Sequence, residues 1–186
     1  MTLECIAGQL ETTADDIPPV YGKISVFHSA VATFFAPSDP SGRHGMRRER
    51  IRSTPSWRGG GARRDCAFVV EDQTKPGMRG MNVVRVLLFF SFEHEGVYYP
   101  CALVEWFKRV RRDPVTGMWV VRPDMTRRKR DKTVLHLDTF LRNAHLIPVF
   151  GNEELPVGFH DSDSLDAFKA YYVNKYIDHQ ANEMVF

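Results

Sequence analysis

The residues most suited to chemistry in this sequence are arginines, and they are crowded into residues 43–64. That segment contains eight arginines, no lysine and one acidic residue, Glu49. Guanidinium groups form paired hydrogen bonds with phosphates and stack on aromatic rings, which ammonium groups do not do. Trp57 lies among them, where it would either stack on a base or anchor the segment to a core. We therefore predict contacts to nucleic acid from this set: Arg47, Arg48, Arg50, Arg52, Trp57, Arg63 and Arg64.

A second basic region covers residues 108–132. From it we predict further phosphate contacts by three residues: Arg127, Arg128 and Arg130. If both regions lie on one side of the fold, they form a single phosphate-binding surface. The alternative is that both are solvated loops, in which some arginines pair with Glu49, Asp65 and Asp113.

Signatures of catalysis and of metal binding are missing from the sequence. It contains no G-x-S-x-G, no P-loop and no G-x-G-x-x-G motif. His136 and Asp138 have a spacing that places both side chains on one face of a strand, but two potential ligands do not make a metal site. We predict no catalytic residue, no bound metal, no cofactor and no small-molecule substrate.

Aromatic residues between positions 98 and 119 allow two interpretations. Large rings dominate protein cores, so most of these side chains are expected to be buried. The alternative is a partial aromatic cage for a methylated lysine of a partner peptide, which needs two or three rings open to solvent around one spot. The candidates for peptide binding are Tyr98, Trp106 and Trp119.

Composition places the chain among globular intracellular proteins. Its 186 residues suit one domain, and 43% of them are hydrophobic. Three cysteines without a C-x-x-C motif favour a reducing compartment. The N-terminus does not resemble a secretory signal, and the longest apolar run, residues 83–92, is too short to cross a bilayer. We expect a protein that is not secreted and has no membrane partner.

Hydrophobic periodicity predicts a mostly β (α+β) fold. After a loose leader at residues 1–20, residues 21–186 form a single domain in this interpretation, with an arginine-rich insertion at 43–64 whose residues 46–53 form at most a short helical turn. Strands are expected near 23–37, 65–71, 118–122 and 133–141, with a hairpin within 82–110 that turns at Glu95–Gly96. Leu165, Phe168, Tyr172 and Tyr176 recur at helical spacing, which predicts an amphipathic C-terminal helix over about 163–180. The expected architecture is a small, antiparallel, partly open β-barrel with that helix packed on it.

Long stretches of the sequence resemble one family. "VFHSAVATFFAPSDPSGRHGMRRERIRSTPSWR", "PGMRGMNVVRVLLFFSFEHEGVYYPCALVEWF" and "SLDAFKAYYVNKYIDHQANE" look like the C-terminal region of fungal Plavaka-type transposase proteins, which are related to the CACTA group. The resemblance covers about residues 21–186. It implies a transposon-derived accessory domain that lacks the catalytic part, acts in the nucleus and has a transposase as a partner.

A second resemblance is to the bromo-adjacent homology (BAH) domain, a β-barrel module of chromatin proteins. Its pattern is similar to Arg85-Val86, Trp106-Phe107 and Ile147-Pro148-Val149 here. This resemblance implies a reader of histone tails or an interaction platform. Three hypotheses follow: a non-catalytic domain that binds DNA or chromatin through phosphate contacts, a module that binds a histone tail or partner peptide, and a transposon remnant without function. An enzyme that acts on nucleic acid with a metal or a cysteine is a minor fourth alternative.

Overall fold

The structure is a computed structural model, and it describes residues 22–37, 39, 42, 44–152, 154–155 and 157–186. The leader predicted at residues 1–20 lies outside the described residues, as does Arg43. The fold is mostly β: an antiparallel sheet nearly closes into a barrel with one seam, and a short helix lies at the C-terminus. The predicted fold class is therefore confirmed.

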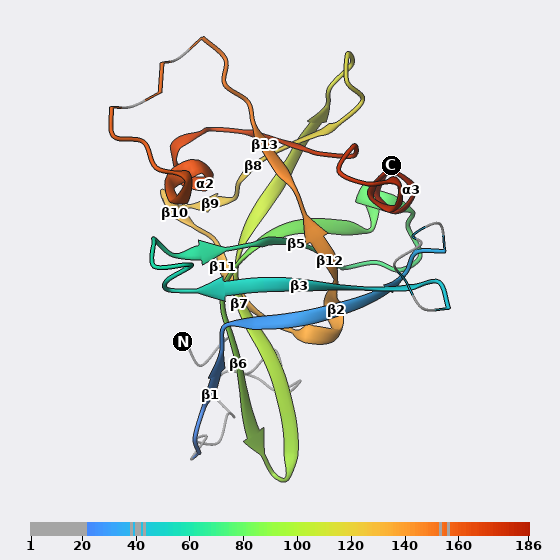
Figure 1. Cartoon of the computed structure of the whole chain (residues 1–186), viewed down its shortest axis with the longest axis vertical. Coiled ribbons are helices and arrows are strands. Elements are labelled where there is room, and N and C mark those ends of the chain that lie inside the picture. Colours follow the sequence, from blue (N-terminus) through green and yellow to red (C-terminus); the bar gives the residue numbers. More distant parts are fainter. Residues whose placement is uncertain (1–21, 38, 40–41, 43, 153, 156) are drawn as a thin grey trace.

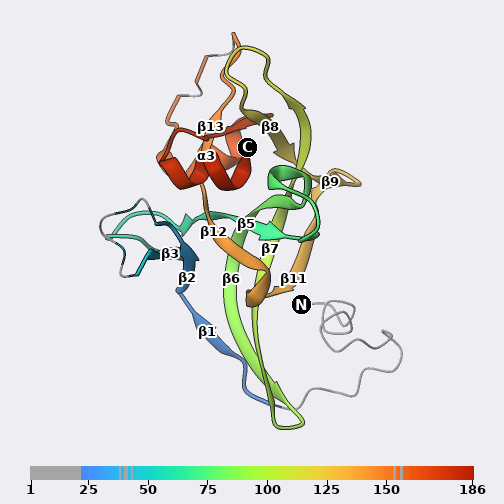
Figure 2. The same ribbon diagram turned by 90° about the vertical axis from the view of Figure 1, so that its right-hand side faces the viewer.

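The centre of the fold is a long hairpin made of β6 (Met81–His94) and β7 (Val97–Arg112). Its turn is the predicted pair Glu95–Gly96, where φ is +51° and +75°. Two consecutive positive φ values characterise the tight turn that suits the twist of paired strands, and the second position favours glycine. The tip of the hairpin projects from the rest of the molecule (Figures 1 and 2).

The other strands of the main sheet add to this hairpin in the order β12-β5-β6-β7-β8-β14-β13, while β1 also pairs with β6 and β11 with β7. All these pairs are antiparallel. The bounds are β1 Ser25–Phe27, β5 Cys66–Val70, β8 Trp119–Pro123, β11 Lys132–His136, β12 Phe140–Ala144, β13 Leu146–Pro148 and β14 Tyr171–Val173.

Two smaller sheets and the turn of one of them carry the arginines that the sequence predicts to contact nucleic acid. β2 (Ser29–Phe35) and β3 (Met46–Thr54) form a hairpin, and β4 (Arg63–Arg64) pairs with the end of β3. β9 (Met125–Thr126) and β10 (Lys129–Arg130) form a short separate hairpin. The helical turn expected at residues 46–53 is wrong, because side chains along β3 alternate between the core and solvent and a strand satisfies that period.

The C-terminal segment also differs from the expectation. The range 163–180 is not one helix: α2 (Ser164–Ala167) is a single turn, β14 follows, and the C-terminal helix is α3 (His179–Val185). Tyr171 and Val173 are fully buried in the sheet, whereas Tyr176 is exposed. Burial of alternate residues outweighed the helical spacing. Short 3-10 helices lie at η2 (Gly77–Arg79), η3 (Leu137–Thr139) and η4 (Asp161–Asp163).

Both cysteines of the described part are core residues. Cys66 packs with Phe68, Phe107 and Tyr171, and Cys101 packs with the phenylalanines of the hairpin tip. Burial raises the pKa of Cys66 to about 12 and that of Cys101 to about 11. Both are therefore protonated side chains that fill space.

Among the described residues, none of the helices has the length and apolar character that a bilayer crossing requires.

Candidate nucleic-acid interface

Strand β3 divides its arginines between two faces. Ile51 and Ser53 point inward and are buried, and Glu49 shares their face. Arg48, Arg50 and Arg52 alternate with them and point outward. Inward side chains of the β2–β3 hairpin pack on the cluster around Val86 and Phe89, so the hairpin presents its other side to solvent. We call that side the outer face, defined by its residues Ser29, Val31, Thr33, Phe35, Met46, Arg48, Arg50 and Arg52.

Arginines that face inward are neutralised by carboxylates. Arg47 pairs with Asp39 and lies 3.7 Å from Glu49. Arg142 of β12 is 2% exposed, and its Nη2 contacts Oε1 of Glu49 at 2.8 Å and Oδ2 of Asp178 at 2.5 Å. Such pairs are costly to separate in a low dielectric. Arg47 thus belongs to a structural network and is not open to a ligand in the way that a solvent-facing arginine is.

The network lowers the pKa of Asp178. Its burial alone would raise the pKa, but hydrogen bonds from Arg142 and from the Ala181 backbone N–H outweigh burial and lower the pKa below its ordinary value. The same carboxylate caps the first turn of α3, with 2.7 Å between Oδ1 and the Ala181 nitrogen. The network therefore ties β12, β3 and α3 together.

The outer-face arginines are held differently. Arg50 Nη1 donates to the Ser29 hydroxyl at 3.2 Å, and Arg52 Nη1 lies 3.5 Å from the Arg50 carbonyl oxygen. Within the described residues, Arg48, Arg50 and Arg52 have no carboxylate at ion-pair distance. Their charge is open to an anion from solution.

Trp57 lies at the end of the outer face, where three guanidinium groups pack on its ring. Guanidinium carbons of Arg52, Arg63 and Arg58 lie 4.9, 4.8 and 5.4 Å from the centre of its rings. Arg63 Nε is also paired with Asp65 at 2.8 Å. Trp57 therefore anchors guanidinium groups instead of lying free, and Arg52 and Arg58 contribute unpaired charge among the described residues.

A hollow opens where this cluster meets the outer face. It has a volume of about 420 Å³ and is lined by the following residues: His28, Ser29, Arg50, Arg52, Thr54, Ser56 and Trp57. Cations, hydroxyls and one indole around a concave site suit a phosphorylated ligand with a ring.

The second basic region lies elsewhere. β9 and β10 pair with each other and not with β2, β3 or β4, so the second basic region adds no residue to the outer face. Arg130 is occupied: its Nη2 contacts Asp166 at 2.8 Å and the Leu165 carbonyl oxygen at 2.6 Å. Arg127 and Arg128 are exposed at the β9–β10 turn, with φ of +51° and +65°.

The pairing predicted as the alternative to binding is confirmed in part. Arg47 meets Glu49, Arg63 meets Asp65, and Arg111 lies 3.5 Å from Asp113. Arg64 is exposed on β4 and carries no ion pair within the described part of the chain. The pairing interpretation therefore applies to some arginines of the segment, and others such as Arg64 have no ion pair among the described residues.

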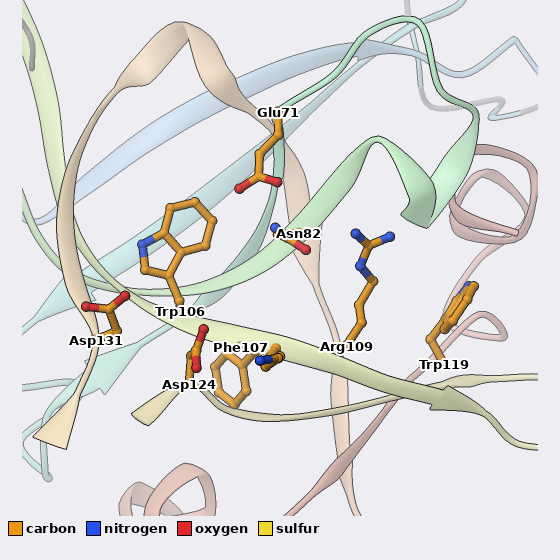
Figure 3. Close-up of a pocket in the computed structure, with 9 residues that line it drawn as sticks. Glu71, Asn82, Trp106, Phe107, Arg109, Trp119, Asp124 and Asp131 are labelled. Carbon is orange, nitrogen blue, oxygen red and sulfur yellow. The ribbon is translucent and has the colours of Figure 1, made fainter. Parts of the chain in front are cut away.

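The three aromatic candidates for peptide binding do not lie at one site. Trp106 and Trp119 line one pocket of about 580 Å³ together with the carboxylates of Glu71, Asp124 and Asp131. Figure 3 shows Glu71 and Asp131 flanking the Trp106 ring, whereas Trp119 lies at the far end beyond Arg109. Tyr98 is 59% exposed near the tip of the central hairpin and does not line this pocket.

Metal binding gains no support from the part of the chain that the structure describes, where no group of three ligand side chains gathers. His136 Nδ1 accepts from the Asp138 backbone N–H at 3.3 Å, so these two residues form a local turn contact.

Sequence reasoning missed several residues of both sites. Val31 and Phe35 reach the outer face because β2 pairs with β3. The alternation of Arg48, Arg50 and Arg52 indicates that residues 46–54 form a strand, but it does not identify the partner strand. Asp124 and Asp131 flank the β9–β10 hairpin and are joined by a backbone hydrogen bond of 3.0 Å. Glu71 is remote from them in the sequence and lines the same pocket only because the end of β5 converges on that hairpin. No sequence signal marks that convergence.

Comparisons with family models, curated proteins and solved structures found no match for this chain. The resemblances to Plavaka-type transposase proteins and to BAH domains therefore stay predictions.

Proposed function

We propose that this chain is a non-catalytic domain that binds nucleic acid, chiefly by phosphate contacts from its outer face. The observation that carries the proposal is the row of Arg48, Arg50 and Arg52, whose charge is not neutralised by any carboxylate of the described residues. Phosphate contacts of this kind supply affinity without reading bases. The proposed setting is DNA or chromatin in a nucleus, in a protein of transposon origin, as the Plavaka resemblance implies.

The contact set is narrower than the sequence predicts. It keeps Arg48, Arg50, Arg52 and Arg64 of the predicted residues and adds Arg58. It excludes Arg47, Arg63 and Arg130, because these three are already paired with carboxylates. The Trp57 ring holds the guanidinium groups of Arg52 and Arg63 by cation–π contacts.

Fluorescence anisotropy with a labelled mixed-sequence DNA, titrated as a duplex and as its separated strands at several salt concentrations, tests the proposal. Each phosphate contact contributes about −0.9 to the log–log salt slope for duplex and about −0.7 for single strands. Replacing Arg48, Arg50 and Arg52 by glutamine should reduce that slope by about 2 to 3. A control replaces Arg127 and Arg128, which lie in the β9–β10 turn and are not part of the outer face. Absence of salt-sensitive binding by either form at roughly 10 μM protein and 50 mM salt would overturn the proposal.

The pocket beside Trp106 is lined by three carboxylates and two cations, Lys108 and Arg109. This acidic pocket favours a second candidate, a module that binds a cationic side chain of a partner peptide such as a histone tail. Glu71, Asp124 and Asp131 beside the Trp106 ring are suited to a lysine or methylated lysine. Calorimetric titration with lysine-methylated and unmodified histone-tail peptides tests this candidate. Asp131→Asn should weaken peptide binding and leave DNA binding unchanged. Failure of both titrations would favour the third hypothesis, a remnant without function.

A further inference from the structure

The outer face carries apolar side chains beside its arginines. Pairing of β2 with β3 sets Val31 opposite Arg50, Thr33 opposite Arg48 and Phe35 opposite Met46. Phe35 is 63% exposed, and Val31 and Met46 are 43% and 41% exposed. A row of cations thus runs beside open apolar surface on the same side of one small sheet.

A duplex offers that apolar surface little to pack against apart from thymine methyl groups. In a duplex the faces of the bases are stacked on one another, and a protein meets only phosphates, sugars and the edges of bases in the grooves. Unpaired bases instead offer their faces, and these stack on exposed aromatic side chains next to a positively charged track. Phe35 is such a side chain.

The spacing of the arginines also suits one strand. Alternate residues of a β-strand lie about 6.8 Å apart in a nearly straight row, which resembles the separation of successive phosphates along an extended nucleic-acid strand. Arg48, Arg50 and Arg52 would contact successive phosphates of a strand that lies along β3. A double helix turns away from a straight row.

The hollow at Trp57 continues this path. It begins at Arg50 and Arg52, where the row ends, and its volume of about 420 Å³ lies within the range of small-ligand sites. His28, Ser29 and Ser56 add hydrogen-bonding groups around it. One nucleotide beyond the row fits a site of this size and chemistry.

We propose that the outer face binds single-stranded nucleic acid in preference to duplex, with phosphates on Arg48, Arg50 and Arg52 and one unpaired base against Phe35. This inference rests on the proposed function, since it names the form of nucleic acid that the same face takes.

The test compares a labelled 12-nucleotide mixed-sequence DNA strand with the duplex of that strand and its complement, under one salt condition. The single strand is expected to bind about tenfold more tightly than the duplex, because stacking of one base is worth about 1–3 kcal/mol and 1.4 kcal/mol is a factor of ten. Phe35→Ala should weaken single-strand binding by about tenfold and leave duplex binding unchanged.

Tyr98→Ala is the matched control, because Tyr98 is an equally exposed aromatic side chain near the hairpin tip. It should leave both affinities unchanged, and urea unfolding should show that both variants fold. Equal affinity for strand and duplex, or equal effects of the Phe35 and Tyr98 variants, would overturn the inference. If the inference were overturned in this way but nucleic-acid binding were still lost on replacing Arg48, Arg50 and Arg52, the proposed function would stand without the preference for single strands. If neither form bound, both proposals would fail.

Discussion

Arg47 and Arg48 are neighbours in the sequence, yet the structure gives them opposite surroundings. Arg47 faces inward, next to Asp39 and Glu49, in a network that continues through Arg142 to Asp178. Arg48 faces outward in a row with Arg50 and Arg52, away from every carboxylate of the described residues. The inner set holds strands together, whereas the outer set is available to a ligand.

This difference teaches that the number of arginines in a segment says little about how many bind. What matters is whether the strand period directs each side chain toward an acid or toward solvent. Changes on the inner face should therefore affect stability, and changes on the outer face should affect binding.

Replacing Arg142 should give the largest effect on stability. In Arg142→Met, Glu49 and Asp178 remain partly buried without their cation, so we expect a loss of about 3–5 kcal/mol in the free energy of unfolding. Urea denaturation followed by circular dichroism measures it. The control Arg50→Met should change stability by no more than about 0.5 kcal/mol. Equal losses in the two variants would show that the faces do not differ.

Adjacent phenylalanines give a second test. Phe34 is 4% exposed and lies under the Arg142 guanidinium, 4.6 Å from its carbon, whereas Phe35 is 63% exposed. Phe34→Ala should cost about 3 kcal/mol, because it leaves a cavity and removes that contact. Phe35→Ala should stay within about 0.5 kcal/mol. The same urea experiment measures both, and a reversed order would mean that the hairpin packs by its other face.

Acid should weaken the inner network selectively. The pKa of Asp178 is lower in the folded protein than in the unfolded chain, so the folded state binds fewer protons and its stabilisation is complete above about pH 4. It is lost as the pH falls through the folded pKa. Urea midpoints measured between pH 7 and pH 3 should therefore decline below about pH 4.

Asp178→Asn should make that decline shallower, because the variant keeps a capping side chain but loses the titrating charge. Some decline should remain, since hydrogen bonds from Thr116 lower the pKa of Asp113. A variant with an unchanged pH profile would contradict the role given to Asp178.

The smallest effect is expected at the β9–β10 turn. Arg127 and Arg128 both have positive φ, a conformation that suits Asn-Gly and is strained for arginine. Arg127→Asn combined with Arg128→Gly should stabilise the fold by about 0.5–1 kcal/mol. Nucleic-acid affinity should be unchanged. If the affinity fell as far as in the variant without Arg48, Arg50 and Arg52, the two basic regions would act together.

Much of the fold follows from local patterns that the sequence displays. The apolar run at residues 83–92 and the turn at Glu95–Gly96 predict the central hairpin. Its strict alternation is broken by a β-bulge between Val86 and Leu88, so that Val86 packs with Phe89 and not with Phe90. The prediction of one helix over about 163–180 is wrong because local patterns in that segment are ambiguous. Tyr172 suits a helical stripe as well as a strand, and only pairing of β14 with β8 and β13 decides between them.

The candidate site is predictable only in part. The sequence identifies the arginines and Trp57, but which arginines are neutralised depends on partners such as Asp178 that are remote in the chain. The acidic pocket needs the end of β5 to converge on the β9–β10 hairpin before Glu71 meets Asp131. Long-range pairing of this kind has no local signature in one sequence.

The buried thiols make selective labelling straightforward. Only the thiolate reacts with a maleimide, and pKa values of about 12 and 11 leave Cys66 and Cys101 almost entirely protonated at neutral pH. With Cys5 replaced by serine, a cysteine introduced at the exposed Thr33 would be the single reactive position. An environment-sensitive dye attached there would lie between Phe35 and the arginine row and would report directly on whatever occupies that face.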